Sequence, residues 1–240
     1  MNIIKFLQTR YIDVIDEIEE DSIRGKVIIY VNPMNYFYLR KNKKMLDRLY
    51  YRMDGIFFIT IVRLFLLKKK KVRRQSFDFT GFADQALSYA SYNNLKVFVA
   101  GGTENENILF QKKIKSSYPN LLINGHINGY ECETKISNYI RAESHDVVIL
   151  GLGNIKQERV ASKLMIGKNT IVFTCGAFIS QTATSKHLKY YPKFINKFNL
   201  RWLYRFIKEP YTIIRVFKYY SIIPLILIYD ALYYYLIEKS

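Results

Sequence analysis

Short apolar runs and longer mixed segments alternate along most of this chain. The apolar runs span residues 27–31, 96–102, 121–125, 147–153 and 170–176. Because they are continuous rather than alternating, they predict strands that are covered on both faces. The segments between them predict helices over 33–52, 80–93, 104–117, 133–143 and 156–166. Strand and helix repeated in this order predict an α/β fold with a parallel sheet and right-handed crossovers.

Glycine and asparagine follow several of the predicted strands, as in the stretch Gly151-Leu-Gly153-Asn154. Ligands bind at this end of a parallel sheet, where glycine lets backbone N–H groups approach an anion at the next helix. The next helix opens with Lys156, Gln157 and Glu158, a cation, an amide and a carboxylate that suit a phosphate and sugar hydroxyls. An ordinary helical first turn is the alternative interpretation of these residues.

Four common site types do not match the sequence. A dinucleotide-binding fingerprint needs a third glycine where Lys156 stands, and the phosphate-binding P-loop motif is missing. The histidines His126, His145 and His187 have neither a GxSxG partner nor metal-ligand spacing. Only His126, which follows a glycine at a predicted strand end, is expected to touch substrate.

The formal net charge of +17 predicts an anionic partner, which is a nucleic acid, a nucleotide or an acidic membrane surface. Composition alone leaves these three open. The basic run 68–71, followed by Arg73 and Arg74, is typical of a solvated loop, with a phosphate or headgroup contact as the alternative. The two cysteines form neither a disulfide framework nor a metal motif, which favours a reducing, cytoplasmic setting.

The pattern changes after about residue 180. Aromatic residues recur every four positions beside a basic stripe, which predicts a helix between Pro192 and Pro210. Such a helix is typical of a membrane interface, and a core-packing helix is the alternative. The basic stripe consists of Lys186, Lys189, Lys193, Lys197, Arg201, Arg205 and Lys208.

Residues 219–237 are almost uncharged, but they contain Pro224 and Asp230. The segment is at the short limit for a membrane span, and an aspartate in lipid is costly. An interfacial or re-entrant anchor is therefore favoured over a spanning helix or a helix of a soluble core or oligomer. We expect a core over 1–183 and a basic, aromatic-rich, membrane-associating helical appendage over 184–240.

Several motifs, in this order and spacing, resemble the WecG/TagA/CpsF glycosyltransferase family, also called glycosyltransferase family 26, over nearly the whole chain. They include 30-YVNPMNY-36, 53-MDG-55, 147-VVILGLGNIKQE-158, 175-CGAFISQTA-183 and 199-NLRWLYRFIKEPYTIIR-215. The resemblance implies a Rossmann-like core that moves an N-acetylhexosamine or hexose from a UDP-sugar to an undecaprenyl-diphosphate-linked sugar. It further implies an inverting reaction without metal or cofactor, at the cytoplasmic face of the bacterial membrane, in cell-surface polysaccharide biosynthesis.

The resemblance also assigns residues. Asp54 matches the proposed general base, although an Asp-Gly pair is otherwise typical of a turn. Asn32 matches a catalytic asparagine, but Tyr30 stands where the family has threonine and Phe57 where it has glycine. Asp78 matches an aspartate that orders its loop and is grouped with the substrate site. The other expected substrate-binding residues are Gly101, Gly102, Gly151, Gly153, Asn154, Lys156, Gln157 and Glu158, with Arg205 and Arg215 neutralising a diphosphate.

Two other functions stay open. A catalytically inactive membrane scaffold would fit the departures at Tyr30 and Phe57. A nucleic-acid binder would fit the charge, but no recognition module is present and the basic stripe adjoins an aromatic one, so no nucleic-acid partner is expected. The expected partners are the UDP-sugar, the lipid-linked acceptor and an anionic membrane surface, and a homo-oligomer stays an alternative. The sequence leaves the donor sugar open.

Overall fold

A computed structural model of the chain describes residues 1–12, 23–65, 72–188, 190–192, 194–195, 198 and 200–238. Its centre is a six-stranded sheet in the order β2-β1-β6-β5-β3-β4, in which every neighbouring pair is parallel. The predicted α/β fold with a parallel sheet is therefore confirmed. The strands are β1 (Val27–Val31), β2 (Leu49–Met53), β3 (Lys96–Gly101), β4 (Leu122–Ile127), β5 (Val147–Gly151) and β6 (Ile171–Thr174).

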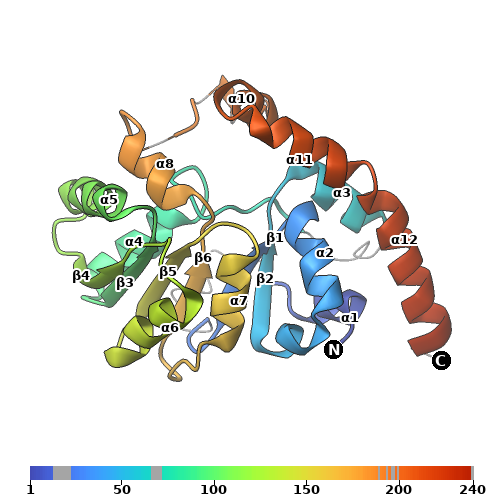
Figure 1. The fold of residues 1–240 in the computed structure, drawn as a ribbon, viewed down its shortest axis with the longest axis horizontal. Coiled ribbons are helices and arrows are strands. Elements are labelled where there is room, and N and C mark those ends of the chain that lie inside the picture. The colour runs from blue at the N-terminus through green and yellow to red at the C-terminus, as the bar shows by residue number, and fades with distance from the viewer. Residues whose placement is uncertain are drawn as a thin grey trace.

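Helices cover both faces of the sheet, which is why strands such as β1 and β5 are continuously apolar. Along β1, Ile29 and Val31 pack into the core on one face, while Ile28 and Tyr30 pack into the core on the other. Residues of α4 (Ala83–Tyr92), α5 (Glu104–Ser117) and α8 (Phe178–Thr184) belong to the second core. The first core contains residues of α1 (Ile3–Thr9), α2 (Pro33–Lys41), α3 (Ile56–Phe65), α6 (Glu133–Ala142) and α7 (Lys156–Lys163). The result is a three-layer arrangement, visible in Figure 1.

The predicted helix over 33–52 is only partly correct. The α2 helix ends at Lys41, a 3₁₀ helix covers Lys43–Arg48, and the chain then enters β2. Residues Leu49–Met53 pair in parallel with Val27–Val31, and Leu49, Tyr51 and Met53 are fully buried. This pairing, rather than helical periodicity, decides the local structure. It also places Asp54 at the carboxyl end of a strand.

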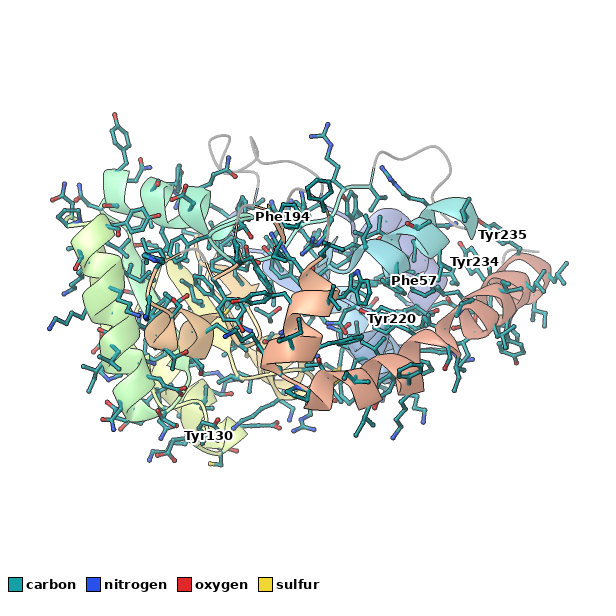
Figure 2. The ribbon with its side chains drawn as sticks, turned by 90° about the horizontal axis from the view of Figure 1, so that it is seen from above. Phe57, Tyr130, Phe194, Tyr220, Tyr234 and Tyr235 are labelled. Atoms are coloured by element: carbon teal, nitrogen blue, oxygen red, sulfur yellow. The ribbon has the colours of Figure 1, made fainter. Side chains whose placement is uncertain are left out.

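The C-terminal segment forms α10 (Arg201–Lys208), α11 (Tyr211–Tyr220) and α12 (Ile223–Tyr233), and a single π-helical turn, Tyr234–Glu238, follows α12. Pro210 separates α10 from α11, as predicted. The α10 and α11 helices lie across the carboxyl ends of the strands, and α12 packs beside α1 and α3 (Figure 1). Seen from above, Phe57 of α3 lies beside Tyr220 of α11, with ring centroids 5.7 Å apart (Figure 2).

Only part of the expected basic stripe is as predicted. Lys189, Lys193 and Lys197 lie outside the described residues. Arg201 is buried and lines a cavity, so it does not continue an outward stripe. Contacts with residues distant in sequence, which helical spacing does not reveal, hold its side chain there. Arg205 lines the same cavity, with its side chain 39% exposed.

Asp230 faces the protein. Its carboxylate accepts hydrogen bonds from Arg40 Nε at 2.6 Å and from the Tyr36 hydroxyl at 2.8 Å, both on α2. The expected cost of placing this carboxylate in lipid therefore does not arise. Among the described residues, Thr212–Glu238 is the one helical stretch long and apolar enough to cross a membrane, and only 22% of its most apolar window is buried.

Candidate active site

A cavity of about 420 Å³ lies at the carboxyl ends of the strands. Its floor includes Asn32 after β1, Asp54 after β2, Asn154 after β5 and Gly176 after β6. The α10 and α11 helices supply its roof, with Trp202, Phe206, Val216, Tyr219 and Tyr220. The cavity thus lies where ligands bind in open parallel sheets, as the glycine-rich strand ends predicted.

The Asp54 carboxylate opens into this cavity. Its backbone N–H continues the sheet by donating to the Val31 carbonyl, and its Oδ1 accepts from the Gly55 N–H at 2.8 Å. The side chain is 35% exposed, which leaves room for a second partner. Gly55 has φ +92°, and a Cβ there would lie 3.3 Å from the Tyr220 hydroxyl. Both the backbone conformation and this close approach therefore favour glycine.

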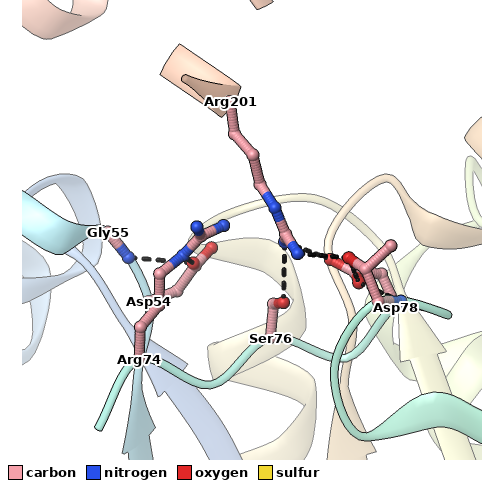
Figure 3. A network of polar contacts seen from close by, with 7 residues as sticks. Asp54, Gly55, Arg74, Ser76, Asp78 and Arg201 are labelled. Atoms are coloured by element: carbon pink, nitrogen blue, oxygen red, sulfur yellow. Dashed lines mark hydrogen bonds and ion pairs between the residues drawn. The ribbon is translucent and has the colours of Figure 1, made fainter. Parts of the chain in front are cut away.

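Arg74 reaches Asp54 from a segment that extends the sheet. Residue 74 pairs in parallel with Met53, and the next N–H, that of Gln75, donates to the Met53 carbonyl at 2.8 Å. The Arg74 Nε consequently lies 3.5 Å from Asp54 Oδ1 (Figure 3). In the sequence Arg74 ends a basic run and opens the block 74-RQSFDFTG-81, but it is not among the expected site residues.

Asn32 and Asn154 meet across the cavity floor. The Asn32 Oδ1 caps α2 by accepting from the N–H groups of Met34 and Asn35, at 3.0 and 3.2 Å. Its Nδ2 donates to Asn154 Oδ1 at 3.4 Å. The cap fixes the side-chain amide of Asn32, so that both asparagines line the cavity.

Glu158 stabilises the turn after β5 through a hydrogen bond to its backbone. It is fully buried, and its carboxylate accepts from the Ile155 N–H at 2.5 Å, Asn35 Nδ2 at 2.9 Å and Gln157 Nε2 at 3.0 Å. Burial raises the pKa of Glu158, although these donors oppose the rise. Ile155 has φ 76°, a strained value for a β-branched residue. The contacts of Glu158 hold this turn, and Glu158 itself does not line the cavity.

Lys156 and Gln157, the two residues before Glu158 on α7, lie differently relative to the cavity. Gln157 lines the cavity, and its Oε1 accepts from the Gly176 N–H at 2.9 Å, which joins the turns after β5 and β6. Lys156 turns away, and its Nζ donates to the carbonyls of Gly129 and Glu131. The structure therefore brings Gly153, Asn154 and Gln157 to the cavity, whereas Lys156, which is also described, is not among its lining residues.

Four further predicted residues, all within the described part of the chain, are not among those that line the cavity. Gly101 packs against Gly151, where an added Cβ would lie 2.6 Å from the Gly151 carbonyl oxygen. A Cβ on Gly102 would meet the side chain of Glu106, which follows it on α5. His126 Nε2 lies 2.7 Å from Glu104 Oε1. A contact of these residues with substrate stays a prediction.

Asp78 binds Arg201 of α10 (Figure 3). Arg201 Nη1 lies 2.9 Å from Asp78 Oδ2 and 3.1 Å from Ser76 Oγ, and Nη2 bonds Thr80 Oγ1. Its guanidinium also lies 4.6 Å from the ring centroid of Tyr191. Burial acts to raise the pKa of Asp78, but Arg201 and the hydroxyl groups outweigh it and hold this pKa below its usual range. Asp78 thus joins the C-terminal segment to the core.

The remaining arginine predictions differ in outcome. Arg205 lines the cavity, with its Nε 3.7 Å from Glu209 Oε2. The side chain of Arg215 lies outside the described residues.

Tyr220 also lines the cavity, and burial, followed by the charge of Asp54, raises its pKa to about 12. Sequence reasoning missed Tyr220 and Arg74, whose positions depend on tertiary contacts.

Comparison with known proteins decides the family. The model of the "Glycosyl transferase WecG/TagA/CpsF family" matches residues 3–239. The chain belongs to this family. The resemblance that the sequence motifs carried is confirmed, and this WecG/TagA/CpsF member is a glycosyltransferase.

Its relatives are enzymes with lipid-linked acceptors. A UDP-Gal:alpha-D-GlcNAc-diphosphoundecaprenol beta-1,4-galactosyltransferase of Shigella boydii is 29% identical over 195 residues, covering 79% of this chain and 80% of the relative. An N-acetylglucosaminyldiphosphoundecaprenol N-acetyl-beta-D-mannosaminyltransferase of Bacillus subtilis (strain 168) is 26% identical over 210 residues, covering 85% and 79%. These two relatives thus share, by name, a diphosphoundecaprenol-linked N-acetylglucosamine acceptor and differ in the sugar transferred.

Proposed function

We propose that this chain transfers a sugar from a UDP-sugar to an undecaprenyl-diphosphate-linked N-acetylglucosamine, with Asp54 as the general base. The main support for this proposal is the position of the Asp54 carboxylate. It opens into a cavity at the strand ends that is also lined by three arginines, Arg74, Arg201 and Arg205. A carboxylate and several cations in one cavity suit a reaction that removes a proton and releases a diphosphate.

The proposed chemistry is a single displacement. Asp54 takes the proton of the acceptor hydroxyl while that oxygen forms a bond to the anomeric carbon of the donor sugar. The bond from this carbon to the UDP oxygen breaks, and UDP leaves with the electron pair. Attack from the side opposite UDP inverts the anomeric configuration. The proposal assigns the charge neutralisation of the leaving diphosphate to arginines, with Arg205 as the first candidate.

The donor is placed at the turn after β5. Gly153, Asn154 and Gln157 line the cavity beside Gly176, and the backbone N–H groups of such turns suit a diphosphate. The Asn32 amide, fixed by its capping role, is placed to bind a sugar hydroxyl close to Asp54. Hexose and N-acetylhexosamine donors both fit the proposal, because the relatives use galactose and N-acetylmannosamine by name.

The acceptor places the reaction at a membrane. The relatives named above act on undecaprenol-linked substrates, and such a lipid does not leave the bilayer. The outward face of α12 exposes Leu225, Tyr229 and Leu232, and the π-helical turn after it exposes Leu236, in keeping with a peripheral position on the membrane. We place the enzyme on the cytoplasmic side, where UDP-sugars are made.

The test is product analysis. The purified full-length chain is incubated with a panel of UDP-sugars and undecaprenyl-diphosphate N-acetylglucosamine, and the lipid product is identified by mass spectrometry. The proposal predicts one added hexose or N-acetylhexosamine with release of UDP. A protein that binds the lipid acceptor and releases no UDP with any donor would instead support the scaffold function.

A further inference from the structure

We propose that the polyprenyl chain of the acceptor leaves the cavity between α3 and α11, across an apolar rim formed by Ile56, Phe57 and Tyr220. This inference rests on the proposed function, and it adds the path of the lipid to it. It assigns a binding role to two residues of α3, a helix that lies outside the C-terminal segment.

The rim begins next to the proposed base. Ile56 lines the cavity and is nevertheless 40% exposed, and Phe57 beside it is 48% exposed. Ile56 and Phe57 directly follow Asp54 and Gly55 in the chain. The proposed base and the start of the apolar rim are therefore only two residues apart in sequence. A large apolar side chain exposed at the edge of a polar cavity favours a ligand with an apolar part.

Tyr220 closes the other side of this rim. Its ring lies 5.7 Å from that of Phe57 and tilts by 32°, while its hydroxyl is next to Gly55 (Figure 2). Tyr220 therefore shows a polar edge to the cavity and an aromatic face to Phe57. One turn earlier on α11, Phe217 is 72% exposed.

The apolar surface continues away from the cavity. The outward face of α3 carries Leu64 two turns beyond Phe57, and α3 packs against α12, whose outward leucines are also exposed. An apolar surface that starts inside a catalytic cavity and runs along two packed helices suits a long hydrocarbon chain better than a soluble sugar.

The chemical groups at the rim match those of a lipid diphosphate. The Arg74 guanidinium contacts the Asp54 carboxylate, with Nε 3.5 Å from Oδ1, and the uncharged rings of Phe57 and Tyr220 lie beside the Gly55 that follows Asp54. The acceptor carries a matching set of groups, a sugar hydroxyl, a diphosphate and a polyprenyl chain. This correspondence is the reason to place the polyprenyl chain, rather than an acyl chain of the surrounding bilayer, on the rim.

The test compares two acceptors that differ only in the length of the polyprenyl chain, the undecaprenyl form and a short-chain, water-soluble analogue. Phe57→Ser should raise the KM of the long-chain acceptor about tenfold relative to that of the short-chain one, the factor expected when part of a ring's burial is lost. Phe57→Leu, which keeps an apolar side chain, should stay near wild type in this ratio. The KM of the UDP-sugar should not change in either variant.

Tyr130 gives a matched control. It is 76% exposed, is labelled far from the rim in Figure 2, and does not line the cavity, so Tyr130→Ser should leave the ratio unchanged. The inference is overturned if Phe57→Ser changes both acceptors equally, changes neither, or matches Tyr130→Ser. A wild-type protein that transfers sugar to neither acceptor contradicts the proposed function itself, which separates the two failures.

Discussion

Replacing Arg201 by methionine should release α10 from the core. The side chains of Arg201 and Asp78 are only 11% and 18% exposed, and their ion pair at 2.9 Å joins the C-terminal segment to the loop that contains Ser76 and Thr80. Methionine keeps the length of the side chain and removes the charge. The variant therefore leaves the Asp78 carboxylate buried without its cation.

The magnitude follows from this burial. Removing one partner of a buried ion pair costs about 3–5 kcal/mol, and the partial exposure of this pair places it near the lower end, at about 3 kcal/mol. Since every 1.4 kcal/mol is a factor of ten, the population with α10 undocked should rise about 100-fold. In the double variant with Asp78→Asn, the two losses should be less than additive by about 2 kcal/mol.

Hydrogen exchange in peptides that cover Arg201–Lys208 measures this opening, with exchange in β3 as the internal control. The folded pKa of Asp78 is lowered, so the docking free energy is fully present above the ordinary value of 3.8 and is lost as pH falls through the lowered pKa. The wild type should show this loss and Asp78→Asn should not. Unchanged exchange in Arg201→Met, or strictly additive losses, would refute the assignment.

Three other variants test separate contacts. Glu158→Gln should lower the free energy of unfolding by about 1–3 kcal/mol, because an amide N–H₂ then faces one of three donors. Because burial raises the pKa of Glu158, the folded state binds a proton more readily than the unfolded state, so the free energy of unfolding of the wild type should fall as pH rises from the ordinary value of 4.5 through the raised pKa; the Gln variant should lack this slope in denaturant titrations. Asp230→Leu should cost about 1.5–3 kcal/mol, the usual loss of a hydrogen bond to a charged group, and thermal unfolding that matches wild type would contradict the docking of α12 on α2. Leu225, Leu232 and Leu236 changed together to serine should reduce liposome flotation without lowering the melting temperature, whereas equal flotation would show that the outward face of α12 and of the turn after it is not a membrane contact.

Much of this arrangement is predictable from local patterns. Continuous apolar runs marked five of the six strands, and the rule that ligands bind at their carboxyl ends led to Asn154 and Gln157. The motif resemblance then led to Asp54 and Asn32. These strands were predicted correctly, and these four residues line the cavity, because a buried parallel strand and its glycine-rich end are encoded by neighbouring residues. Their roles in binding and catalysis stay predictions.

The rest depends on contacts between distant segments. The strand β2 merged with a helical pattern because only its pairing with β1 distinguishes it. Glu158 was expected to bind substrate from the first turn of a helix, but the sequence does not show that its carboxylate is buried and bonded to Asn35, 123 residues away. The spacing of basic residues assigned Arg201 to a basic stripe. Its ion-pair partner Asp78 is more than a hundred residues away in sequence, so the spacing could not indicate this contact. Helical and strand periodicity cannot record partners of this kind.

The most direct test of the proposed chemistry is the turnover of Asp54→Asn with a UDP-sugar and undecaprenyl-diphosphate N-acetylglucosamine. The variant keeps the size of the side chain and its contact with the Gly55 N–H, but it removes the basic carboxylate. Turnover should fall by roughly 10²–10⁴-fold, with UDP affinity near that of wild type. Asp47→Asn, an exposed acid that does not line the cavity, should turn over normally. Near wild-type turnover in Asp54→Asn would contradict the assignment of the base.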